Sequence, residues 1–167
     1  DNDAPASYVP PAGTTAVNVF APEVSVTAAN GKVDFAINFR DPNGNVLTLL
    51  NFYNNSVDID GAGGYQEFVE YGGFKSYTVG SPSDLAVSAV SGTDRLRFTG
   101  TSAYGGLIVN DVGRVQANFD AVSTLQISMG ATGNTGGLRQ YGSLFSAVSF
   151  GSPVTVSAPT ADLVTTT

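Results

Sequence analysis

Hydrophobic and polar residues alternate along much of this chain with a period of two. The clearest case is the segment 32–39, KVDFAINF, which has one apolar side and one mostly polar side. The apolar positions are Val33, Phe35, Ile37 and Phe39. A period of two is that of a β-strand with one buried face. The segment therefore predicts a half-buried strand.

Similar short runs of β-branched and aromatic residues recur about every ten residues, separated by Gly, Asn, Asp, Ser or Pro. They predict strands over 16–20, 24–28, 32–39, 46–53, 65–71, 74–79, 84–90, 94–100, 106–110, 114–120, 123–129 and 144–150. The turn sequence DPNGN, 41–45, predicts that 32–53 folds as a hairpin. No window has a convincing helical period. The pattern as a whole predicts an all-β protein, an antiparallel β-sandwich of the jelly-roll or Ig-like kind.

The two ends of the chain differ from this pattern. Residues 1–15 are rich in Pro, Ala, Gly and Thr and have no period, which is typical of an extended arm. Residues 152–167 read as a short strand, a break at Pro159 and a second short strand. We therefore expect an N-terminal arm over 1–15, a sandwich domain over 16–151 and a C-terminal strand and tail over 152–167, with both ends extended.

Composition narrows the range of functions. Only 13% of the 167 residues are charged, and the net charge is −7 with seven Lys and Arg. No basic stripe is present to neutralise phosphates, so we expect no nucleic-acid partner. No apolar run is long enough to predict a membrane span. A weakly charged surface rich in Gly, Thr and Ser is typical of extracellular β proteins, so we expect a secreted or cell-surface location.

The chain contains no Cys and no His. It therefore has no disulfide framework, no thiolate nucleophile and no Ser-His-Asp triad, and it lacks the commonest transition-metal ligand. An enzyme would have to act through carboxylates alone, and the sugar platforms that Trp usually supplies to a glycosidase are missing. We therefore expect a protein that is not an enzyme.

The stretch 57–71, VDIDGAGGYQEFVEY, is the main candidate for ion binding. Asp58 and Asp60 stand two residues apart before glycines that allow the backbone to fold back, and Glu67 or Glu70 could complete an ion site. Calcium prefers carboxylate and carbonyl oxygens on such a loop, so Asp58, Asp60 and Glu67 are the candidate calcium ligands. The spacing is not that of an EF-hand. The alternative is a polar turn between two strands without an ion.

Aromatic and loop residues are candidates for glycan binding. Tyrosines at the end of a sandwich can stack on sugar rings, although they can equally cap the core with the hydroxyl toward water. The tyrosines considered are Tyr53, Tyr65, Tyr71, Tyr77, Tyr104 and Tyr141. The glycine-rich segment 132–143, TGNTGGLRQYGS, has the length of a binding loop and holds Arg139 and Tyr141. Tyr104, Arg139 and Tyr141 are the candidate binding residues.

The last nine residues, PTADLVTTT, resemble the first strand of Ig-like conserved-repeat modules found in tandem in large bacterial surface proteins. The body of the chain looks like the β domains that often precede such repeats. This resemblance implies a piece of a secreted, cell-surface protein and carries no site residues with it.

A sandwich with extended ends can polymerise by strand addition, in which main-chain hydrogen bonds supply the affinity. The ends of this chain, 1–20 and 154–167, lack the Lys residues that usually guard strand edges. The leading hypothesis is therefore a non-enzymatic surface filament, sheath or layer subunit whose partners are identical copies. The alternative is an adhesin or carbohydrate-binding module that recognises glycans, with or without calcium.

Overall fold

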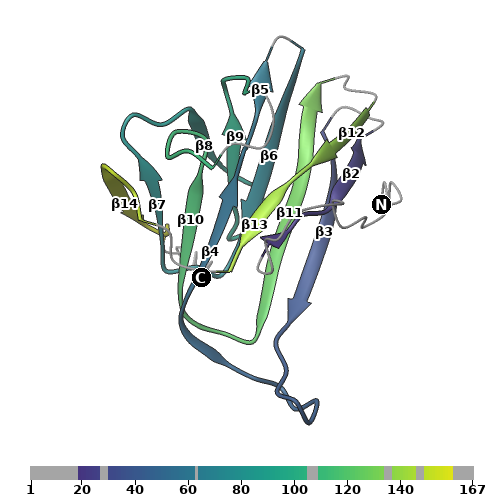
Figure 1. Ribbon diagram of the computed structural model, residues 1–167, viewed down its shortest axis with the longest axis vertical. Helices are drawn as coiled ribbons and strands as arrows, with labels where there is room; N and C mark the ends of the chain where they lie inside the picture. Colours follow the sequence, from purple (N-terminus) through teal and green to yellow (C-terminus); the bar gives the residue numbers. More distant parts are fainter. Residues whose placement is uncertain are drawn as a thin grey trace, which may run out of the picture.

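The computed structural model describes residues 19–26, 30–62, 64–104, 109–133, 137–145 and 149–159. Two antiparallel sheets lie face to face and confirm the predicted all-β sandwich (Figure 1). The described residues form no helix, so none of them belongs to a helix that could span a membrane. The predicted arm at 1–15 and the end of the tail at 160–167 lie outside the described residues.

The first sheet, which we call sheet A, contains both the first and the last strand. Its order is β1 (Val19–Phe20), β13 (Gly142–Leu144), β4 (Leu49–Val57), β10 (Val115–Val122), β7 (Ser76–Gly80) and β14 (Pro153–Ser157). The strand expected at the start of 152–167 is therefore an edge strand of the sandwich. It pairs with β7 along its whole length.

The second sheet, sheet B, packs against sheet A. Its order is β3 (Gly31–Asn38), β11 (Thr124–Gly133), β6 (Tyr65–Tyr71), β9 (Leu96–Gly100) and β8 (Leu85–Ala89), with β5 (Gly61–Ala62) paired to β6. The bounds of β6 are those predicted from the sequence. In the predicted strand 106–110, residues 106–108 lie outside the described part, and Val109 and Asn110 are not in a strand.

A two-stranded ribbon of β2 (Glu23–Val26) and β12 (Gly137–Gln140) closes one side of the sandwich. It continues the β1–β13 pairing in the same register after a break at Pro22, which has no N–H to donate to a ladder. The N–H of Tyr141 bonds to the Pro22 carbonyl at 3.1 Å across this break. Val24 and Val26 are buried, and β2 contacts both β3 and β11.

The core lies between the sheets and is built by the alternation that the sequence shows. In β3 the apolar positions are partly buried and pack on the core, while Asp34, Ala36 and Asn38 are exposed. The fully buried side chains of sheet B include Val69, Phe98, Leu125, Ile127 and Met129. Each strand therefore contributes one face to a common interior.

The predicted hairpin over 32–53 is wrong, because β3 belongs to sheet B and β4 to sheet A. The turn itself forms: Asp41 Oδ1 accepts hydrogen bonds from the N–H groups of Asn43 and Asn45, at 2.8 and 2.9 Å. Only one bridge follows, between Arg40 and Val46. The chain then crosses to the other sheet, which lets the Phe39 and Phe52 rings meet across the core at 5.2 Å.

A buried polar cluster joins the two sheets. The Tyr71 hydroxyl of β6 donates to Asn54 Oδ1 of β4 and lies 2.6 Å from the Ser56 hydroxyl. The Asn54 amide in turn donates to the Ser143 hydroxyl of β13 at 2.8 Å. All four side chains are nearly inaccessible to water. Since buried polar groups need partners, this cluster restricts how β6 can sit against β4.

We predict that Tyr71→Phe destabilises the fold by about 1–3 kcal/mol, because it leaves Asn54 and Ser56 buried without their hydroxyl partner. Urea denaturation measures the loss. Tyr53→Phe is the matched control, since Tyr53 is 38% exposed and its change should stay within about 0.5 kcal/mol. Equal stability of the two variants would contradict the prediction.

Candidate functional site

The three acidic residues proposed as calcium ligands lie together at one end of the sandwich. Asp58 and Asp60 follow β4, and Glu67 lies in β6. Strand β5 pairs with β6 directly after Asp60, so the chain reverses and returns beside it. The Glu67 N–H donates to the Asp60 carbonyl at 2.7 Å, and the Asp60 N–H donates to Glu67 Oε2 at 3.3 Å.

Two glycines permit this close packing. A Cβ atom at Gly61 would overlap the carbonyl of Gly100, and one at Gly100 would overlap the carbonyl of Ile59. The backbone of the 58–61 turn therefore lies directly against β9. The glycine in the DIDG sequence is needed for this approach, whether or not the turn binds an ion.

Glu67 is the most perturbed carboxylate of this group. Its side chain is on the core-facing side of β6 and is only 4% exposed. Burial raises its pKa to about 7, and the negative charges of Asp60 and Asp58 act in the same direction. The nearest cation is Arg139, whose Nε lies 4.0 Å from Glu67 Oε1. At that distance the ion pair does not offset the loss of water.

Asp60 and Tyr104 are linked. The Tyr104 N–H donates to Asp60 Oδ1 at 3.1 Å, and the Tyr104 hydroxyl donates to Asp84 Oδ2 at 2.7 Å. Burial raises the pKa of Asp60, and the nearby Asp58 charge raises it further. Burial and the bond to Asp84 likewise raise the pKa of Tyr104. Tyr104 thus connects the carboxylate turn to the start of β8.

The other two predicted binding residues also reach this end of the molecule. Arg139 of β12 stacks on the Tyr65 ring, with its guanidinium carbon 3.7 Å from the ring centre. Tyr141 is 2% exposed and its hydroxyl donates to the Gly130 carbonyl at 2.6 Å. Tyr141 is therefore a core residue here and presents no face to a surface ligand. The structure brings all six predicted residues into one region, which their spacing in the sequence did not indicate.

In this region, hydrogen bonds link the turn after β4 to β6 and to the start of β8. Among the described residues, no group of three or more acidic side chains is placed to hold a metal ion. Asp60 and Glu67 already accept hydrogen bonds from backbone N–H groups. Calcium binding by Asp58, Asp60 and Glu67 stays a prediction.

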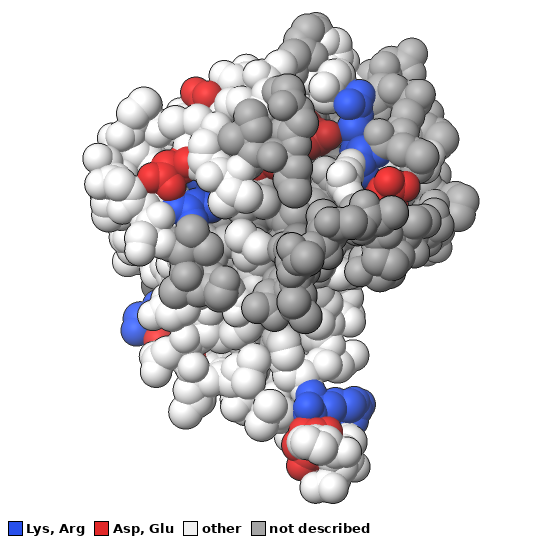
Figure 2. All heavy atoms as spheres, in the orientation of Figure 1, with Lys and Arg blue, Asp and Glu red and all other residues white. Residues whose placement is uncertain are grey.

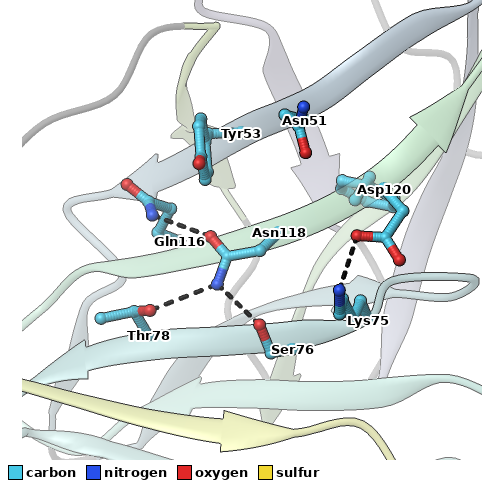
Figure 3. Close-up of a pocket in the computed structure, with 9 residues that line it drawn as sticks. Asn51, Tyr53, Lys75, Ser76, Thr78, Gln116, Asn118 and Asp120 are labelled. Carbon is cyan, nitrogen blue, oxygen red and sulfur yellow. Dashed lines mark hydrogen bonds and ion pairs between the residues drawn. The ribbon is translucent and has the colours of Figure 1, made fainter.

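A second region, which sequence reasoning missed, lies on the outer face of sheet A. A hollow of about 360 Å³ opens over β4, β10 and β7 (Figure 3). Its polar lining residues are Asn51, Tyr53, Lys75, Ser76, Thr78, Gln116, Asn118 and Asp120. The only sequence signal is the polar alternation in 115–120, VQANFD. The lining residues of β4 and β7 come close together only because both strands pair with β10.

Tyr53 is the exposed member of the six tyrosines considered as sugar platforms. It is 38% exposed, whereas Tyr71, Tyr77 and Tyr141 are buried and Tyr65 and Tyr104 are partly buried. Most of these rings therefore belong to the core, but the hydroxyls of Tyr71 and Tyr141 bond inside the protein and do not face water. Tyr53 instead stands at the rim of the hollow in Figure 3.

Most basic side chains of the protein form ion pairs with acidic side chains. Among the described residues, every Lys and Arg other than Arg40 lies within 4.0 Å of an acidic side chain. Figure 2 shows the result on one face, where basic groups lie beside acidic ones on a mostly uncharged surface. The fully buried Glu70 receives bonds from Lys32 and Arg97 at 2.8 and 2.6 Å. Burial opposes this, yet the two cations hold the pKa of Glu70 below its usual range.

Comparison with protein-family models, with curated proteins and with solved structures found no match to this chain.

We predict that Glu67→Gln flattens the pH dependence of stability between about pH 5 and pH 8. Because the pKa of Glu67 is about 7 in the folded state, the folded protein keeps a proton that the unfolded chain releases above its ordinary value near 4.5. The free energy of unfolding should therefore fall as the pH rises to 7, by roughly 3 kcal/mol from this group alone. Glutamine does not titrate and removes that fall.

Urea denaturation at several pH values measures the effect. Glu23→Gln is the control, because Glu23 lies in β2 outside this cluster and should keep the wild-type slope. Asp34 and Glu70 have lowered pKa values, so their contributions are lost only at more acidic pH. A Glu67→Gln protein with the wild-type slope would refute the raised pKa.

Proposed function

We propose that this chain is a non-enzymatic structural protein that assembles with identical copies by strand addition at the edges of sheet A. The observation that carries the proposal is topological. The first and last described strands, β1 and β14, form the two edges of this one sheet. A strand added beside either of them would extend the same sheet, with main-chain hydrogen bonds joining the copies.

Strand β14 has the properties of an edge open to pairing. Among the described strands it pairs only with β7, and all five of its residues, PVTVS, are exposed. Val154 and Val156 are 44% and 40% exposed. The strand carries no charge, and its Pro153 stands at the first position, where it disturbs pairing least. An uncharged, β-branched edge favours the addition of a further strand.

Sheet B is less suited than sheet A to the addition of strands at both of its edges, because one edge is charged and covered. Its edge strand β3 carries the charged side chains of Lys32 and Asp34, and β2 lies against it. Its other edge, β8, is uncharged and exposed like β14. Sheet B therefore has one open edge, whereas the two edges of sheet A are both terminal strands.

The proposed contact is head to tail, with β14 of one copy beside β1 of the next. Such a heterologous contact joins two different surfaces, so each end of a growing assembly keeps one unpaired edge. Further copies can therefore add to form an open filament. Phe20 of β1 is fixed by an edge-to-face contact with Phe35 at 5.2 Å. That contact holds β1 in place as a template for the incoming strand.

We place this assembly outside the cell, at its surface. The support is compositional: 13% charged residues and no Cys or His, together with the resemblance of 159–167 to surface-protein repeats. The terminal segments expected to take part, 1–20 and 154–167, reach beyond the described residues at both ends. The described portions, β1 and β14, are the basis of the proposal.

We predict that Val156→Lys prevents assembly of the 167-residue chain. A lysine on an edge strand would have to bury its charge against the neighbouring copy. Sedimentation velocity and negative-stain imaging measure the size of the particles. Wild type should form concentration-dependent oligomers or filaments, and the variant should remain monomeric with an unchanged melting temperature.

Val87→Lys is a closely matched control. Val87 lies in β8, the open edge of sheet B, and has the same 40% exposure as Val156. The proposal requires that this variant assembles like wild type. A wild-type protein that stays monomeric at high concentration would refute it, as would assembly that survives Val156→Lys.

A further inference from the structure

The hollow on the outer face of sheet A is a second structural feature, separate from the sheet edges. Its volume of about 360 Å³ is in the lower range of small-molecule sites. Its walls come from three adjacent strands: Asn51 and Tyr53 of β4, Gln116 and Asn118 of β10, and Thr78 and Ser76 of β7 (Figure 3). These three strands are paired with one another through β10, so the pairing fixes the relative positions of the lining side chains.

A hydrogen-bond network organises the floor. The Gln116 amide donates to Asn118 Oδ1 at 2.8 Å, and the Asn118 amide donates to the hydroxyls of Ser76 and Thr78 at 3.0 and 3.3 Å. The Thr78 hydroxyl lies 2.9 Å from that of Thr155. Asn118 thus uses both amide hydrogens within the network and acts as its centre.

Bonding capacity remains at the rim of the network. Gln116 bonds to Asn118 through its amide nitrogen, so the Gln116 side-chain carbonyl can accept a bond from a ligand. Ser76 accepts the bond from Asn118 through its hydroxyl oxygen, so the Ser76 O–H can donate to a ligand. Within the described part of the chain, the side chains of Asn51 and Tyr53 form no hydrogen bond. Asn51 also has a φ of 50°. The ladder between β4 and β10 skips it, so this side chain departs from the regular strand geometry.

Charge in the hollow is balanced. Lys75 and Asp120 pair with each other at 2.9 Å. They are the charged members of the lining. The chain has a net charge of −7, and its other basic side chains, apart from Arg40, are paired with acids elsewhere. A polyanion would find no unpaired cation in the hollow, so the electrostatics favour an uncharged ligand.

We infer that this hollow is a binding site for a neutral, hydroxyl-rich saccharide. Amides and hydroxyls that both donate and accept match the hydroxyl groups of a sugar. The ring of Tyr53, with its face partly exposed, supplies an apolar surface for the sugar ring. The site is open along the sheet face, so a residue within a longer glycan chain can enter it. The site lies on the face of sheet A, and its occupation does not depend on assembly at the edges.

The test is binding of the purified chain to an array of neutral and acidic oligosaccharides, followed by calorimetric titration with a soluble neutral hit. Tyr53→Ala should weaken binding about tenfold or more, as expected for an aromatic anchor. Gln116→Ala should also weaken it. Gln126→Ala is the matched control, because Gln126 is an exposed glutamine on β11 of sheet B and its removal should change nothing.

Each outcome decides the inference. Binding of a neutral saccharide that is weakened by both changes in the hollow and unaffected by Gln126→Ala supports it. Binding to no member of the array, or to acidic members alone, overturns it. Equal affinity of all variants places the saccharide elsewhere and overturns it as well. Circular dichroism of each variant confirms that the compared proteins are folded.

Discussion

Burial of one face of every strand in a shared interior is the constraint on which the rest of this structure depends. At the centre of that interior the Phe98 ring of sheet B contacts the rings of Tyr71 and Tyr77 at 6.3 and 5.0 Å. Because successive side chains of a strand point to opposite sides, burial of one face sends every second residue outward. In β10, burial of Val115, Ala117 and Phe119 directs Gln116, Asn118 and Asp120 outward, where they line the polar hollow.

Glu67 and Glu70 show how the two faces of one strand differ. Both side chains are buried and both belong to β6. Glu70 points outward and has Lys32 and Arg97 within 2.8 Å, so its pKa falls. Glu67 points inward and has one cation at 4.0 Å, so burial prevails and its pKa rises to about 7. The number and distance of the partners decide the direction of each shift.

Two surfaces of sheet A carry no unpaired charge, because β14 has no charged residue and Lys75 pairs with Asp120 in the hollow. This condition is shared by the β14 edge, where main-chain groups of a neighbouring copy can bond, and by the hollow, where hydroxyl groups can bond. The first surface is a sheet edge and the second is a sheet face, so the two proposed interactions do not compete. Thr155 lies at their border, since it belongs to β14 and contacts Thr78 of the hollow.

Local pattern in the sequence was enough to predict the fold class and many strands. The alternation in 32–39 and the run 65–71 determine strands on their own, because each has a face to bury and no competing helical period. The absence of Cys and His likewise excluded several chemistries without any structure. These are properties of neighbouring residues, which the sequence displays directly.

Only the tertiary structure decided which strands became neighbours. Phe39 and Phe52 could be buried within one hairpin or across two sheets, and the packing of the whole core selected the second arrangement. The same long-range choice put β1 and β14 at the edges of one sheet, gathered Asp60, Glu67 and Arg139 at one end and placed Tyr53 opposite Asn118. Such contacts join residues that are far apart in the chain, so a local sequence pattern cannot predict them.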